Sequence, residues 1–205
     1  MLDVSVDVTQ GTSVWETLTA IGTLAAAAAT FLAVLVALFG RDLWETRHRP
    51  ILEITYEQKE PYCRDVPDLI PSRWVRVKVT NRGRGTAKRC KGKMIAVYRA
   101  DGSLREDRDP MLLHWAGMLL QQGLEPLDLA REEYQLLDVV SAGSVRRDAA
   151  LIVADPTPAG FAKELEAGQK HTVTVAVYAD NAEPVTAEFV ITFDGDIHSL
   201  KMQPA

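Results

Sequence analysis

The residues in this sequence that are best suited to chemistry are basic, and they lie close together. Between Leu69 and Ala100 the chain carries ten of its 23 lysines and arginines and none of its 28 aspartates and glutamates. The formal net charge of the whole chain is −5, so the remainder is strongly acidic. A surface formed by such a run attracts anions, among them phospholipid headgroups, nucleotides, nucleic acid and acidic proteins.

Six of these basic residues are our candidates for a contact face. Two of them alternate with valines in one segment, so they point to the same side of an extended strand. The six are Arg76, Lys78, Arg82, Arg84, Lys88 and Arg89. An anionic lipid surface or an acidic protein is the favoured partner. A merely solvated strand face, balanced by the acidic remainder, stays an open alternative. Nucleic acid is disfavoured, because Trp74 is the only aromatic residue near the six in sequence.

Signals for catalysis or metal binding are weak. The four histidines are isolated, and none lies in an HExxH or paired i, i+4 arrangement. The stretch 194–198 holds two aspartates and a histidine, but its glycine is misplaced for a calcium loop and a turn explains it. The stretch 141–144 lacks the GxSxG pattern and predicts another turn. We therefore predict a protein without enzymatic activity, cofactor or metal.

The two cysteines, Cys63 and Cys90, show no CxxC spacing. In a reducing compartment they are expected to remain thiols, whereas an oxidising compartment would permit a disulfide. Their state therefore depends on the side of the membrane on which they lie.

A membrane anchor precedes the basic run. From Leu18 to Phe39 the chain has 22 residues without a charge. As a helix they span about 33 Å, enough to cross a hydrocarbon core. Trp15 and Trp44 are about 43 Å apart on such a helix, which places both at membrane interfaces. The segment 14–40 is thus predicted to be one transmembrane helix, whose small-xxx-small spacing, as in Gly22-x-x-x-Ala26, would permit a homo-oligomer.

The charges beside this helix predict its orientation. Residues 1–17 have no lysine or arginine, whereas Arg41, Arg47 and Arg49 follow the apolar run. Positive charge marks the cytoplasmic side, so we expect residues 1–13 outside and the chain after the helix inside, at the inner (plasma) membrane. A cleaved signal peptide fits less well, because the apolar run is too long and its start is acidic.

After a polar connector at 41–50, ended by Pro50, the chain alternates as strands do. Alternation is clearest at 74–80, 171–178 and 186–193, and further strands are expected at 51–56, 87–99 with a bulge at Gly92, 112–115, 134–140 and 149–153. We expect a loop at 58–72, a short helical turn at 161–166 and a polar tail at 197–205. Seven or eight strands without helical crossovers predict one antiparallel, immunoglobulin-like β-sandwich over 51–196.

Two stretches carry a resemblance to a known family. The run WVRVKVTNRGRGTAKRCKGKM, from Trp74 to Met94, resembles the strand–turn–strand of bacterial CARDB-type immunoglobulin-like modules. The run LEAGQKHTVTVAVYAD, from Leu165 to Asp180, resembles their Leu-x-x-Gly entry into the penultimate strand. Together they cover about a third of the chain, and the whole also resembles prokaryotic proteins with one membrane helix and a β-sandwich. Such modules imply adhesion or scaffolding outside the cell, whereas the charge rule places this one inside.

The sequence therefore predicts a membrane-anchored binding or scaffolding module that presents a basic sandwich face at the inner membrane surface. One alternative is an extracytoplasmic adhesion or envelope module with the opposite topology. Another is a sensor or effector subunit that binds a nucleotide or nucleic acid.

Overall fold

The computed structural model describes residues 14–105, 110–119, 121–154 and 163–205, with the side chains of residues 40–47 outside the description. The expected N-terminal segment 1–13 and the Trp44 side chain thus lie outside the described part. The chain divides into two units, Met1–Arg47 and His48–Ala205, which are treated separately below.

The first unit is one helix, α1 (Val14–Arg47). Its stretch Val14–Phe39 has a mean hydropathy of 2.3 and is long and apolar enough to cross a membrane. The hydroxyls of Thr19, Thr23 and Thr30 donate to backbone carbonyls one turn earlier, as Thr30 Oγ1 does to Ala26 O at 2.9 Å. Such bonds satisfy polar side chains in an apolar medium. The helix continues to Arg47, so most of the predicted polar connector at 41–50 is helical.

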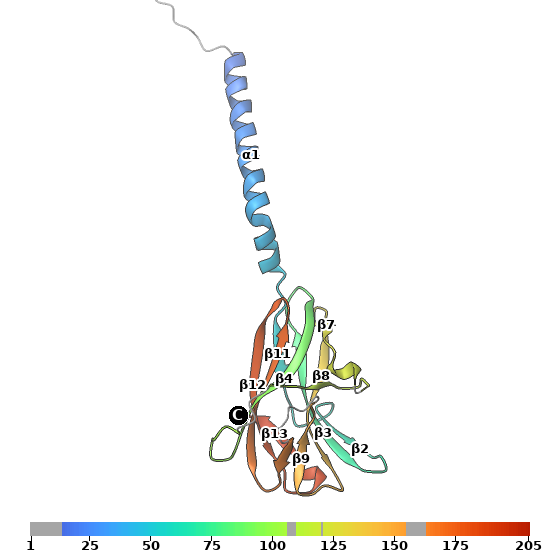
Figure 1. Ribbon diagram of the computed structural model, residues 1–205. Coiled ribbons are helices and arrows are strands. Elements are labelled where there is room, and N and C mark those ends of the chain that lie inside the picture. The colour runs from blue at the N-terminus through green and yellow to red at the C-terminus, as the bar shows by residue number, and fades with distance from the viewer. Residues whose placement is uncertain (1–13, 106–109, 120, 155–162) are drawn as a thin grey trace, which may run out of the picture. The chain divides into compact units, whose positions relative to one another are not determined.

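The second unit consists of two antiparallel sheets, which confirms the predicted all-β fold (Figure 1). One sheet has the order β1 (Leu52–Thr55), β3 (Ser72–Asn81), β8 (Tyr134–Gly143), β9 (Ala149–Ile152), β10 (Glu164–Glu166), with β2 (Cys63–Val66) beside β3 and β6 (His114–Trp115) beside β8. The other has the order β13 (Lys201–Pro204), β12 (Ala182–Thr192), β11 (Lys170–Ala179), β4 (Ala87–Tyr98), β5 (Met111–Leu112), with β7 (Leu127–Leu129) beside β4.

This strand order is that of an immunoglobulin-like sandwich at its centre. Strands β1, β3 and β8 take the places of A, B and E, and β4, β11 and β12 take those of C, F and G. The place beside E belongs to β9, which follows β8 in the chain instead of preceding it. The fold therefore keeps the inter-sheet crossings of the immunoglobulin class with a different fourth strand.

Alternation along the central strands produces the core. Val75, Val77 and Val79 of β3 are completely buried, as are Val173 and Val175 of β11 in the opposite sheet. The residues between them on β3 face outward. Period-2 patterning thus gives one dry and one outer face on each sheet.

The apolar run that begins at Met111 changes sheets. Met111 and Leu112 pair with β4 in one sheet, whereas His114 and Trp115 pair with β8 in the other. Leu113 between them is buried and forms a bridge with Ala154. The expected strand at 112–115 is therefore two short strands at the crossing between the layers.

Several sequence predictions were wrong. The predicted loop at 58–72 contains β2, and the predicted turn at 141–144 continues β8 to Gly143. The predicted polar tail at 197–205 forms a short 3₁₀ turn and β13, whose register on β12 buries Met202. Of the predicted helical turn at 161–166, residues 161 and 162 lie outside the described part and Glu164–Glu166 form β10. These segments have too few apolar residues to show a period, so their pairing partners decide their structure.

The predicted bulge at Gly92 was also wrong. Gly92 pairs regularly with Val177, and the irregularities on β4 lie between Met94 and Ala96 and between Ala87 and Cys90. A Cβ atom on Gly92 would lie 2.3 Å from Leu137 Cδ2, so the glycine makes room for a core leucine.

Candidate functional site

The six candidate basic residues are distributed over two sheets and a connecting turn. Arg76 and Lys78 lie on the outer face of β3, whereas Lys88 and Arg89 lie on β4 of the other sheet. Arg82 and Arg84 lie in the turn between these strands, which hydrogen-bonds to the entry segment: Arg82 N donates to Ile51 O at 2.7 Å. The structure therefore divides the six into an outer-face pair and a group beside the segment that follows α1.

Four of the six have partners within the sandwich. Arg76 Nε lies 2.6 Å from Asp138 Oδ1. Arg82 contacts both Glu53 and Glu132 at 2.8 and 3.1 Å, and Arg89 Nε lies 3.4 Å from Asp180. Lys78 Nζ lies 4.4 Å above the ring of Tyr134. Acidic residues distant in sequence thus pair with three of the six, Arg76, Arg82 and Arg89.

Arg84 and Lys88 differ from the other four. Both side chains are exposed, and within the described part of the chain neither has an acidic partner. They are the members of the predicted face that remain available to an external anion.

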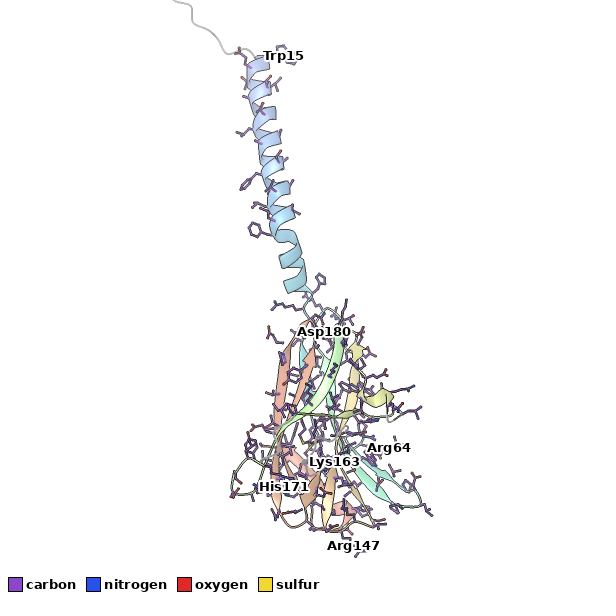
Figure 2. The ribbon with its side chains drawn as sticks, in the orientation of Figure 1. Trp15, Arg64, Arg147, Lys163, His171 and Asp180 are labelled. Carbon is purple, nitrogen blue, oxygen red and sulfur yellow. The ribbon has the colours of Figure 1, made fainter. Side chains whose placement is uncertain are left out.

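A pocket of about 500 Å³ lies on the outer side of the seven-stranded sheet. It lies over β3 and β8, between β2 on one side and Gly117, Met118, Leu119 and Leu124 on the other. Its apolar lining is Val66, Trp74, Met118, Leu119, Leu124, Val153 and Ala154. Figure 2 labels Arg64, which is on β2 and also lines the pocket.

Three ionisable side chains form a row across the floor of this pocket. Register places Arg76 of β3 opposite Asp138 of β8, and Asp138 opposite His114 of β6. Asp138 Oδ1 accepts from Arg76 Nε, while Asp138 Oδ2 lies 3.4 Å from His114 Nδ1. The Asp138 side chain is 4% exposed, so the pair is desolvated and its separation would be costly.

Burial raises the pKa of Asp138, whereas the positive charge and hydrogen bond of Arg76, and after it His114, act in the opposite direction. The carboxylate therefore depends on both neighbours for its charge. Both of its oxygens face protein donors, so the floor of the pocket has no free carboxylate acceptor.

The far side of the His114 ring is closed. Its Nε2 atom is buried without a hydrogen-bond partner among the described residues. A Cβ on Gly123 would lie 2.1 Å from that atom, so the glycine backbone packs directly on the ring. An Asp–His pair can activate a hydroxyl or thiol nucleophile only through this nitrogen. Among the described residues, no hydroxyl or thiol is hydrogen-bonded to this nitrogen.

The guanidinium of Arg76 keeps unused donors. Its two Nη atoms form no hydrogen bond with any described residue, and they are not among the buried unpaired atoms. They are therefore accessible from the pocket that Arg76 lines. The Trp74 indole beside them is held by its Nε1–H, which donates to Ser72 Oγ at 3.1 Å.

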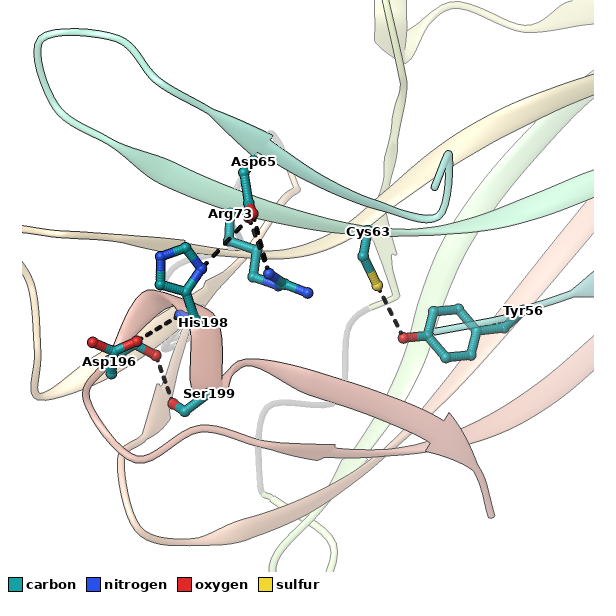
Figure 3. A network of polar contacts seen from close by, with 7 residues as sticks. All are labelled: Tyr56, Cys63, Asp65, Arg73, Asp196, His198 and Ser199. Atoms are coloured by element: carbon teal, nitrogen blue, oxygen red, sulfur yellow. Dashed lines mark hydrogen bonds and ion pairs between the residues drawn. The ribbon is translucent and has the colours of Figure 1, made fainter. Parts of the chain in front are cut away.

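The sequence at 194–198 forms a hydrogen-bonded turn. Asp196 Oδ1 accepts from His198 N at 2.8 Å, and Ser199 Oγ donates to Asp196 O (Figure 3). His198 Nδ1 lies 3.7 Å from Asp65, which also accepts from Arg73. Among the described residues no group of three or more His, Cys, Asp or Glu is arranged to hold a metal ion.

Both cysteines are free thiols in the core. Cys63 Sγ lies 3.3 Å from the hydroxyl of Tyr56 (Figure 3). Burial, and after it the carboxylate of Asp128, raises the pKa of Cys90 to about 11. A thiol with that pKa is a poor nucleophile at neutral pH.

Comparison with known proteins gives no family. No family model and no curated protein matches the chain. One solved structure, a Bacteroides uniformis beta-glucuronidase 2 covalently bound to cyclophellitol-6-carboxylate aziridine, aligns at 13% identity with a TM-score of 0.31. That alignment covers 69% of this chain and 13% of the glucuronidase, and so low a score supports no argument. The resemblance to CARDB-type modules stays a prediction.

Sequence reasoning missed the row under the pocket. It treated His114 as isolated and took Arg76 as part of a solvent face. The available signal was Asp138, a charge in the middle of the apolar run LLDVV, because a buried carboxylate requires a partner. Nothing in the sequence indicates that its partners are Arg76, 62 positions earlier, and His114, 24 positions earlier.

Proposed function

We propose that this protein is a membrane-anchored, non-enzymatic binding module whose ligand site is the pocket over Arg76, Asp138 and His114. The observation that supports it is the combination of a volume of about 500 Å³, a mainly apolar lining and a few converging polar groups. Ligand sites in proteins have this volume and this composition. The apolar helix Val14–Phe39 would hold the site at the inner membrane surface, with the N-terminus outside and the sandwich in the cytoplasm.

A blocking variant tests the site. Val66 lines the pocket from β2, and a tryptophan there suits a strand while filling part of the volume. The matched control is Val145→Trp, at a position that is 77% exposed and outside the pocket. The full chain in lipid nanodiscs is screened by fluorine NMR against a panel of fluorinated acids, amides and alcohols, with empty nanodiscs as the blank.

We expect fragments that bind the wild type and Val145→Trp to lose affinity for Val66→Trp by about tenfold or more. The proposal is wrong if no fragment binds the wild type. It is equally wrong if the bound fragments bind Val66→Trp with unchanged affinity.

A second role is favoured by Arg84 and Lys88, which are exposed and lack acidic partners among the described residues. Their turn hydrogen-bonds to Arg49 and Ile51, and α1 continues as helix from Phe39 to Arg47, a rise of about 12 Å. We propose that these two residues contact anionic headgroups, where each basic residue contributes about 1 kcal/mol.

Hydrogen exchange of the full chain tests this contact in nanodiscs of phosphatidylcholine, with and without phosphatidylglycerol. We expect slower exchange over 82–88 with the anionic lipid, and loss of this difference at high salt or in Arg84→Glu with Lys88→Glu. Identical exchange in the two lipids would refute the contact.

A further inference from the structure

The floor of the pocket offers hydrogen-bond donors and lacks an acceptor for them. Nε of Arg76 is used by Asp138, but both Nη atoms are accessible and unpaired among the described residues. The two oxygens of Asp138 face Arg76 and His114. A ligand therefore meets the outer edge of a guanidinium whose position is already held by a 2.6 Å contact.

The walls around these donors are apolar. Trp74 stands next to Arg76 on the outer face of β3, two residues away, and its indole is held by Ser72. Met118, Leu119 and Leu124 provide the opposite wall from the segment after β6. Such walls exclude water from a bound group and strengthen its hydrogen bonds.

We infer that the ligand is a small amphipathic carboxylate, with its carboxylate on the Nη edge of Arg76 and its apolar body against Trp74 and Leu124. This inference rests on the pocket being the ligand site, as proposed above. A carboxylate accepts two parallel hydrogen bonds from a guanidinium edge, and such charge-assisted bonds are about twice as strong as neutral ones.

The charges at the mouth are compatible with an anion. The positive charge of Arg76 is already balanced by the carboxylate of Asp138. The carboxylate of the ligand therefore needs a second positive charge nearby. Arg64 lines the pocket, is exposed and has no acidic partner among the described residues. Asp68 also lines the pocket, so a carboxylate bound next to it would be repelled, which favours the Arg76 edge for the carboxylate of the ligand.

The test compares three matched probes on the full chain in nanodiscs: 3-(4-fluorophenyl)propanoate, the corresponding amide and the corresponding alcohol. Affinities are measured by fluorine NMR. We expect the acid to bind about tenfold more tightly than the amide or the alcohol, because one charge-assisted hydrogen bond is worth at least this factor.

Two variants isolate the guanidinium. Arg76→Met combined with Asp138→Leu removes both charges together, so no buried charge is left without its partner. Arg76→Lys keeps the charge but removes the two-pronged edge. Arg76→Met with Asp138→Leu should bind the acid no better than the amide, whereas Arg76→Lys, which keeps a cationic donor, should retain only part of the preference. The control Lys78→Met, on the same face of β3 but outside the pocket, should keep the preference.

The outcomes separate this inference from the proposed function. If acid, amide and alcohol bind equally and Val66→Trp abolishes all three, the ligand class is wrong and the pocket remains the site. If none binds the wild type, both statements are wrong. A preference for the acid that survives in a folded Arg76→Met with Asp138→Leu also overturns the inference.

Discussion

Gly92 of β4 faces the side chain of Leu137, and both residues are buried. Alanine there would place its Cβ 2.3 Å from Leu137 Cδ2, so we expect Gly92→Ala to lower the free energy of unfolding by about 1–3 kcal/mol through overpacking. Gly143→Ala is the control, because nothing lies within 4 Å of its Cβ position. Thermal unfolding followed by far-UV circular dichroism measures both. Equal midpoints for the two variants would contradict this account of Gly92.

His171 of β11 is a buried imidazole with neither nitrogen hydrogen-bonded among the described residues. Burial is the main cause that lowers its pKa below the ordinary value of 6.5. Arg105 and Arg99 act in the same direction, whereas Glu166 opposes them. Because the unfolded chain then binds more protons, this residue makes stability fall as the pH drops below about 6.5.

His171→Leu should remove that part of the pH dependence and raise stability by about 1–3 kcal/mol, since it also removes two unsatisfied polar atoms. Denaturant unfolding at pH 7.5 and pH 5.5 measures both effects. The exposed His198 provides the control, and His198→Leu should keep the loss of stability at low pH. If His171→Leu loses as much stability between pH 7.5 and pH 5.5 as the wild type, another group is responsible for the pH dependence.

At the scale of elements, the C-terminal strand β13 completes the six-stranded sheet. It pairs with β12 from Phe189 to Thr192, and Leu200 just before it is completely buried. We expect Leu200→Ala to cost about 2–5 kcal/mol of unfolding free energy, the range for a large-to-small change in a core. Gln203→Ala, on the exposed side of the same strand, should have little effect. Guanidinium unfolding followed by tryptophan fluorescence distinguishes the two, and similar midpoints would mean that the strand adds nothing to the core.

The Arg76–Asp138 pair connects β3 and β8 next to a register shift between Val75 and Arg76. The shift places Arg76 opposite Asp138 rather than Val139, so both charges face outward while the valines stay inside. The register between the two strands, and not the type of residue alone, thus makes Arg76 a member of an ion pair on the floor of the pocket.

For the whole molecule, the flanking charges of α1 predict a cytoplasmic sandwich. C-terminal fusions to a green fluorescent protein and to alkaline phosphatase should give fluorescence without phosphatase activity. Replacing Arg41, Arg47 and Arg49 with asparagine should weaken that bias. Phosphatase activity without fluorescence in the unmodified chain would reverse the topology and favour an extracytoplasmic adhesion or envelope role.

The sequence was sufficient for the features that depend on local patterns. An uncharged run of 22 residues predicts a membrane-length helix, and valine alternation around Arg76 and Lys78 predicts a strand with one dry face. Those patterns were enough to predict an all-β sandwich after one apolar helix. These patterns follow from the periods of helix and strand, so residues that are neighbours in the sequence are sufficient to predict these elements.

Only the tertiary structure decided where the charges and the short segments go. Asp138 meets Arg76 and His114 because register aligns three strands that are far apart in the sequence. The segment 201–204 becomes a strand because β12 offers it an edge, although its own residues show no apolar alternation. A charge pair and an edge strand gain their free energy from partners distant in the chain, and a single sequence does not specify which partners those are.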